Sequence, residues 1–198
     1  MSLRDLYRSL IEVCDPSRPI EAVAIKALAA AADRVENMPA VASPQSLQPP
    51  FQDVLAADDA HPVCMQIAAA RLPWAVPQTS GDAKYRADSV KKMIVELIGP
   101  GGMVTTDDVR VGLYGILPGA KYGFRTHPAE EVFIMLAGEA DWAKADSGFA
   151  TLRTGARAYH PSMMRHATRT NDYAFMSFYI WSGDISFDRY RYDGRMPS

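Results

Sequence analysis

The pattern of hydrophobic and polar positions changes along the 198-residue chain near residue 90. Before that point, apolar residues recur at spacings of three and four, which is typical of amphipathic helices. The pattern predicts helices over 3–14, 20–35, 51–57 and 62–71, with a proline-rich loop over 39–50. The first part of the chain is therefore expected to be helical.

After residue 90 the apolar segments are shorter and are bounded by glycine, proline and polar turn residues. They predict short strands over 93–98, 109–117, 122–126, 131–136, 140–143, 150–153, 156–160, 166–170 and 174–181. Strands at this spacing are typical of an all-β sandwich or barrel. We therefore predict a mainly β protein, with a helical N-terminal extension over residues 1–85 packed on a β-barrel domain over 86–198.

Composition narrows the range of partners. A net charge of −2 with 48% hydrophobic residues gives no reason to expect a nucleic-acid or anionic membrane partner. No apolar run is long enough to span a bilayer, and the N-terminus has the pattern of an amphipathic helix, not of a signal peptide. Cys14 and Cys64 lack metal-binding spacing, so we expect reduced thiols, a cytoplasmic location, and a monomer or homodimer acting on a small molecule.

Candidate chemistry concentrates around one predicted strand. His127 lies four residues before Glu131, which opens the apolar run 132–136, and a turn at 137–139 is predicted to end that strand. A carboxylate at the mouth of a buried strand is costly unless it is paired or holds a metal ion. In an extended chain, His127, Glu131 and Phe133 would point to one side, while Glu130 would face solvent.

Two spaced motifs resemble those of the cupin superfamily. The first is Gly119-x5-Arg125-x-His127-x3-Glu131-x6-Gly138, and the second is Gly155-x5-Pro161-x-Met163-x2-His166-x3-Thr170. A longer match resembles the cupin-type dimethylsulfoniopropionate lyases, in particular the Q type; it comprises Tyr122, 129–132, 136–142, 160–163, 166–170 and 179–184. The resemblance implies a jelly-roll barrel behind a helical region, with both motifs converging on one metal ion.

The expected metal ligands are His127, Glu131 and His166. Two histidines and one carboxylate with open positions suit Fe, Mn or Zn as a single divalent ion. The alternatives are an ion pair at a strand edge for His127 and Glu131, and a hydrogen-bonded core histidine for His166. We interpret His160 as part of a turn at Pro161, with a fourth ligand or a group supporting the ligands as its alternatives.

The chain departs from the family pattern at three positions. Arg125 stands where the family has its first histidine; it cannot bind a metal, but it can pair with a carboxylate of the protein or of a substrate. Phe133 replaces a tyrosine that is a leading candidate for the catalytic base in the family. Met163 replaces a glycine of the second motif, which we expect to affect turn shape more than chemistry.

The resemblance implies a metal-dependent lyase that cleaves dimethylsulfoniopropionate to dimethyl sulfide and acrylate by β-elimination. Such a reaction needs a base that reaches the carbon next to the carboxylate. Tyr122 is the remaining matched tyrosine and is the predicted base. Its alternative role is a barrel-wall aromatic, and Tyr159, Tyr179 or a metal-bound hydroxide are possible substitutes for it as base.

Aromatic side chains are candidates for holding the sulfonium group, because a cation is attracted to an aromatic face. These candidates are Phe133, Trp142, Tyr179, Trp181 and Tyr114, which could equally be core residues. Two other functions stay open. One is another metal-dependent cupin enzyme, such as a dioxygenase or isomerase on a small carboxylate. The other is a non-catalytic module that binds a small carboxylate, since one fold hosts many functions.

Overall fold

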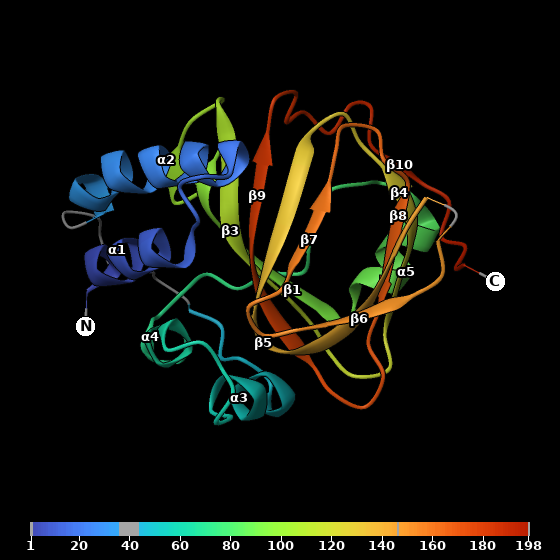
Figure 1. Ribbon diagram of the computed structural model, residues 1–198, viewed down its shortest axis with the longest axis horizontal. Coiled ribbons are helices and arrows are strands. Elements are labelled where there is room, and N and C mark those ends of the chain that lie inside the picture. The colour runs from blue at the N-terminus through green and yellow to red at the C-terminus, as the bar shows by residue number, and fades with distance from the viewer. Residues whose placement is uncertain (1, 36–43, 146, 198) are drawn as a thin grey trace.

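The computed structural model describes residues 2–35, 44–145 and 147–197 (Figure 1). In these ranges the helices are α1 (Leu3–Val13), α2 (Pro19–Val35), α3 (Pro49–Leu55), α4 (Val63–Ala69) and α5 (Ala83–Ser89). The first four match the predicted helices. Of the predicted loop over 39–50, residues up to 43 lie outside the described ranges, and residues 44–48 have no regular structure.

Helix α5 was not predicted, because only Tyr85 and Ser89 of its residues are buried and it therefore has no apolar stripe. Asp82 begins it as the N-cap: its carboxylate accepts hydrogen bonds from the backbone N–H groups of Lys84 and Tyr85. The helix spans the predicted domain boundary at residue 85, and the division of the chain there stays a prediction.

The second part of the chain forms a β-barrel of two facing sheets. Its strands are β1 (Lys92–Gly99), β2 (Val104–Thr105), β3 (Val109–Ile116), β4 (Lys121–Thr126), β5 (Glu130–Lys144), β6 (Ala150–Arg153), β7 (Arg157–His160), β8 (His166–Arg169), β9 (Phe175–Ser182) and β10 (Arg191–Tyr192). The order across the path is β10-β4-β8-β5-β9-β3-β1-β2, with β6 and β7 also paired to β5. The barrel does not close fully. The predicted fold class, a jelly-roll barrel behind a helical extension, is confirmed.

Strand β5 belongs to both sheets, which corrects one prediction. The expected turn at 137–139 does not occur, and the strand continues to Lys144. Gly138 has a φ of +71°, and a Cβ atom there would lie 2.1 Å from the carbonyl oxygen of Ala174. The pairing of β5 with β9 also shifts between Met135 and Ala137. The glycine therefore bends a continuous strand instead of ending it.

Alternation along β5 separates two cores. Val132 and Ile134 belong to the core between sheet and helices, whereas Phe133 and Met135 belong to the core inside the barrel. Glu131 lies on the same side as Phe133, as the sequence predicted, because residues two apart on a strand share a face. The interior of the barrel therefore receives the polar residues of the candidate site.

The helices cover the outside of one sheet. Figure 1 shows α2 beside β3 and β9, with α1 packed against α2, and Leu6, Leu10 and Leu28 are buried there. The fully buried carboxylate of Glu21 in α2 forms an ion pair of 2.8 Å with Arg157 of β7. Buried apolar surface and this ion pair together fix the helical part on the barrel.

Candidate metal centre

Three side chains from separate parts of the sequence meet inside the barrel. His127 lies between β4 and β5, Glu131 is the second residue of β5, and His166 begins β8. One donor atom from each lies within 4.8 Å of the other two. The Nε2 atoms of His127 and His166 are 3.6 and 3.2 Å from Oε2 of Glu131. The predicted ligands therefore come together in a buried group that could hold a metal ion, and ligation itself stays a prediction.

Backbone carbonyls orient the two histidine rings. Nδ1 of His127 donates to the carbonyl of Ala129 at 3.0 Å, and Nδ1 of His166 donates to that of Met164 at 2.8 Å. Among the described residues, neither Nε2 atom has a hydrogen-bond partner. Burial, followed by the charge of Arg125, lowers the pKa of His166 well below its usual range. Two buried imidazole nitrogens without hydrogen-bond partners thus face a carboxylate, which fits a divalent metal ion.

Glu131 is the centre of the hydrogen-bond network. Burial alone would raise its pKa, but His127 and the hydrogen bond from His160 hold that pKa well below its usual range. Its Oε1 accepts a hydrogen bond from the indole N–H of Trp181, and its Oε2 accepts one of 3.0 Å from Nδ1 of His160. The carboxylate is therefore ionised and fixed in position.

The interpretation of His160 as a turn residue is wrong. His160 ends β7, is fully buried, and pairs across the ladder with Glu131. Its ring stacks on that of His166, with 4.0 Å between centroids and 13° between planes. Burial lowers the pKa of His160 to about 4, so its ring is neutral and its Nδ1–H supports Glu131. The turn begins only at Pro161, because the β7 ladder extends to His160.

Tyr122 projects from β4 into the same interior. Its hydroxyl is 2.7 Å from that of Tyr190, whose ring is parallel to the ring of His127 at 6.0 Å. Burial, followed by Tyr85, raises the pKa of Tyr122 well above its usual range. The same phenol is stabilised in its ionised form by Arg125 and by the hydrogen bond to Tyr190.

Arg125 is buried with its guanidinium carbon 3.6 Å from the centre of the Tyr122 ring. It donates to the backbone carbonyl of Tyr122 and to the hydroxyl of Thr168, both at 3.3 Å. In the described part of the chain, no carboxylate lies within 4.0 Å of it. Burial would lower its pKa, but Tyr122 and Glu131 raise it overall, so Arg125 stays charged.

The predicted aromatic residues form one wall of the interior. Phe133 packs against Trp142, Tyr114 and Tyr179, with centroid distances of 4.9, 5.6 and 6.3 Å. The indole N–H of Trp142 and the hydroxyls of Tyr114 and Tyr179 are buried without a hydrogen-bond partner among the described residues. Buried polar atoms rarely stay unpaired, so this wall is suited to a ligand with polar groups.

Residues 22–176 match the family model of the dimethylsulfoniopropionate (DMSP) lyases. The chain belongs to the DMSP lyase family. The DMSP lyase DddQ of Ruegeria pomeroyi DSS-3 is 39% identical over 89 residues, which cover 45% of this chain and 44% of that protein. The aligned part therefore spans less than half the length of this curated relative, although the identity agrees with the resemblance predicted from the motifs.

Two solved structures of DMSP lyases share the fold. The crystal structure of DddQ from Ruegeria pomeroyi DSS-3 has a TM-score of 0.60 at 24% identity and covers 96% of both chains. Crystal structures of the DMSP lyases RdDddP and RnDddQII give a TM-score of 0.64 at 22% identity, covering 96% of this chain and 94% of that one. The helical extension therefore belongs to the shared fold along with the barrel.

Sequence reasoning missed two interior residues of this DMSP lyase family member. Tyr190 lies beyond the last predicted strand, in a segment without apolar alternation, so no local pattern marked it. Lys92 begins β1, where a lysine usually indicates an exposed strand end, yet it is 1% exposed. Only the folded arrangement of the strands shows that these side chains turn inward.

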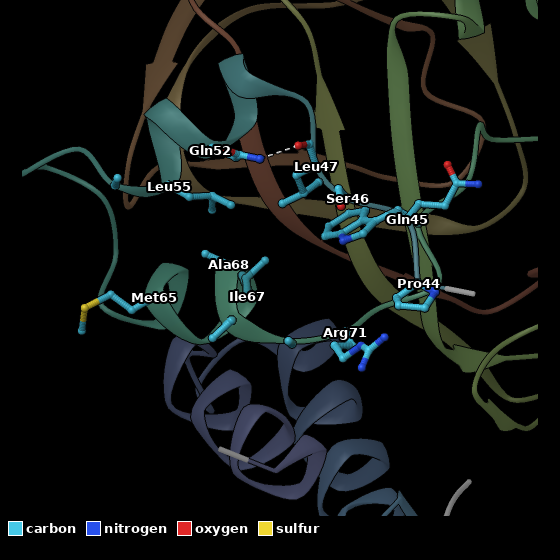
Figure 2. A pocket seen from close by; sticks show the side chains of 14 residues that line it. Pro44, Gln45, Ser46, Leu47, Gln52, Leu55, Met65, Ile67, Ala68 and Arg71 are labelled. Carbon is cyan, nitrogen blue, oxygen red and sulfur yellow. Dashed lines mark hydrogen bonds between the residues drawn. The ribbon is translucent and has the colours of Figure 1, made fainter. Parts of the chain in front are cut away.

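A groove outside the barrel differs in chemistry from the metal centre. It has a volume of about 850 Å³ and runs between α3, α4 and the segment at 44–47 (Figure 2). Leu47, Leu55, Ile67 and Trp74 contribute to its lining, and Arg71 is the one charged side chain among the described residues there. It lacks the titratable groups of the interior. Separately, none of the described helices is long and apolar enough to cross a membrane.

Proposed function

We propose that this chain is a metal-dependent lyase that cleaves DMSP into dimethyl sulfide and acrylate. The observation that carries the proposal is the buried His127, Glu131 and His166 group, whose unpartnered Nε2 atoms face an ionised carboxylate. Membership of the DMSP lyase family supports the substrate. The overall reaction releases one proton, as the C–S bond breaks and a C–H bond on the neighbouring carbon is lost.

The ligand set suits one divalent ion of Zn, Fe or Mn. A metal ion held by these residues would supply Lewis-acid stabilisation of the negative charge that develops beside the substrate carboxylate. His160 and Trp181 orient the Glu131 carboxylate for that purpose through their hydrogen bonds. Without them, Glu131 would be free to rotate away from the two histidines.

Tyr122 is the proposed base. Its phenol lies inside the barrel and shares a hydrogen bond with Tyr190. Arg125, which is charged and lacks a carboxylate partner in the described part of the chain, is placed to receive the substrate carboxylate. The sulfonium group would bind against the aromatic faces of Phe133, Trp142 and Tyr179. A cation–π contact with these rings would hold the sulfonium, and the rings would exclude water from it.

The proposal also covers the cellular location, the domain organisation and the oligomeric state of the enzyme. Cys14 and Cys64 are both buried and unbridged, which supports a reducing, cytoplasmic location. We propose a two-part organisation with the border near residue 85, a small-molecule substrate as the partner, and a monomer or homodimer.

Headspace gas chromatography tests the function. Metal-stripped protein is reloaded with Zn, Mn or Fe and incubated with DMSP, and dimethyl sulfide is quantified. We expect release with at least one metal, and none from His127→Ala or His166→Ala. The proposal would be contradicted if metal-loaded protein binds DMSP but releases no dimethyl sulfide, a result that favours a small-carboxylate-binding module. Consumption of oxygen during the incubation would favour a dioxygenase instead.

A further inference from the structure

Lys92 is a buried lysine inside the barrel without a charged partner. Its side chain is 1% exposed, and among the described residues its Nζ has no hydrogen-bond partner. Nζ lies 3.6 Å from the centre of the Tyr122 ring, compared with 5.3 Å for Tyr85 and 6.0 Å for Tyr192. A buried unpaired amine is costly, so its presence against the proposed base needs a reason.

The groups that face Lys92 do not neutralise an ammonium ion. Helix α5 contributes Tyr85 and Asp88, but the Asp88 carboxylate already accepts a hydrogen bond of 2.5 Å from Tyr192 of β10 and lies 3.7 Å from the amine of Lys121. An engaged carboxylate gives little support to a second cation. The side of the site formed by α5 and β10 therefore leaves the Lys92 amine unpaired.

Strand β4 disfavours the charged form further. It contributes Tyr122 and the permanently charged Arg125. Burial, followed by the charge of Arg125, lowers the pKa of Lys92 to about 6, and Asp88 opposes this only in part. Above that pH the amine is neutral and carries a free lone pair. Lys92 is then a proton acceptor inside the barrel, whereas Arg125 can only donate.

Tyr122 needs such an acceptor. A tyrosine abstracts a proton only as phenolate, and burial works against its ionisation. We propose that Lys92 is a positioning residue for the elimination, which accepts the phenolic proton of Tyr122 so that the phenolate can act as base. This inference rests on the proposed function and adds to it a residue outside the cupin motifs.

The proton transfer is balanced. The O–H bond of Tyr122 breaks and an N–H bond forms on Lys92 through one bridging water molecule, because Nζ lies over the face of the ring without a hydrogen bond to the hydroxyl. The resulting ammonium ion stays beside the ring of the phenolate, where the two opposite charges attract each other. The phenolate then takes the proton from the substrate carbon as dimethyl sulfide leaves, and Lys92 returns its proton to solvent, which accounts for the proton released overall.

The pH dependence of kcat/KM for dimethyl sulfide release tests this role. In the wild type, activity should rise as pH increases through about 6, because Lys92 must be neutral to accept a proton. Lys92→Met should lower kcat/KM by about 10²–10⁴-fold and remove that rise. Lys92→Arg is the matched control: it keeps a charge and similar bulk but cannot accept a proton, so it should be equally impaired.

Chemical rescue keeps the test independent of folding. Ethylamine added to Lys92→Ala should restore activity in proportion to the free-base fraction, while a quaternary ammonium salt should not. Tyr122→Phe should gain nothing from ethylamine. Two results would overturn the inference in a protein whose wild type is active. One is a rise in kcat/KM near pH 6 that persists in Lys92→Met, and the other is a fully active Lys92→Arg. A wild type that releases no dimethyl sulfide would overturn the proposed function instead, before any variant is compared.

Discussion

His160 and Glu131 face each other across the β5–β7 ladder, and Nδ1 of His160 donates a 3.0 Å hydrogen bond to the Glu131 carboxylate. A group that orients a metal ligand usually contributes about 10–100-fold to metal affinity. We predict that His160→Phe, which keeps an aromatic ring against His166 but removes the donor, weakens zinc binding by that factor. Competition with a chelator measures it.

The neighbouring Tyr159 provides the control for that experiment. Its hydroxyl binds Glu130 on the outer face, so Tyr159→Phe should leave zinc affinity unchanged. Equal affinities for the wild type and His160→Phe would show that Glu131 needs no support from His160.

Phe133 lies in the interior where the family resemblance implies a tyrosine. Its ring packs against Trp142 and Tyr179 and lies 6.4 Å from the ring of His160, so an added hydroxyl would lie near the metal centre. We predict that Phe133→Tyr raises kcat for dimethyl sulfide release by about tenfold or more, because a second proton acceptor joins the site. Phe187→Tyr, at a 37% exposed position, is the control and should change nothing. An unchanged rate in Phe133→Tyr would remove position 133 from the chemistry.

Met163 has a φ of +62°, in the left-handed region that favours glycine, and its side chain is 51% exposed. The sequence predicted an effect on turn shape at this position. Met163→Gly should raise the free energy of unfolding by about 1 kcal/mol, because the backbone strain is relieved without loss of packing. Urea denaturation measures the difference. Met164→Gly serves as the comparison and should destabilise; a Met163→Gly protein no more stable than wild type would contradict the strain.

Lys92 predicts how stability depends on pH. Its pKa is about 6 when folded and about 10.4 when unfolded, so between these values the unfolded chain binds the extra proton. The free energy of unfolding should therefore rise from pH 7 to 8.5, with a contribution of up to about 1.4 kcal/mol per pH unit from this residue. Urea denaturation at both pH values should show a smaller rise in Lys92→Met. Identical slopes would mean that Lys92 is charged in the folded protein.

The ion pair between Glu21 and Arg157 fastens α2 to β7. Arg157→Met should lower the free energy of unfolding by about 3 kcal/mol, because it leaves the fully buried Glu21 carboxylate with only the longer 3.6 Å contact to Arg18 and the backbone N–H of Asp15. Arg153→Met breaks the more exposed pair with Glu139 and should cost less than about 1 kcal/mol. Similar costs for the two variants, measured by urea denaturation, would argue against a special role for the buried pair.

The hydrophobic pattern of neighbouring residues predicted the features that depend on those residues alone. Two-residue alternation placed Glu131 and Phe133 on the interior face of β5, and helical spacing found α1 and α2. The sequence predicted a turn at 137–139, but Gly138 bends a continuous strand. A glycine with positive φ can either end a strand or bend it, and the surrounding sequence looks the same in both cases. Only the pairing with β8 and β9 distinguishes these outcomes.

Long-range pairing also explains what was missed at the site. His160 supports Glu131 through a cross-strand register that spans 29 residues, and Lys92 reaches Tyr122 only when β1 and β4 enclose the same interior. The metal-ligand candidates, in contrast, were visible as spaced motifs. Motif spacing thus indicated the candidate metal ligands, while the groups that support them depend on how distant strands pair.

Metal content per chain tests the central claim most directly. Wild-type protein dialysed against zinc and then against metal-free buffer should retain one ion per chain by inductively coupled plasma mass spectrometry. His127→Ala and His166→Ala should retain less than about a tenth of that, while the exposed-site variant Tyr159→Phe should retain it fully. Full occupancy in both histidine variants would contradict the assignment of His127, Glu131 and His166 as the metal centre.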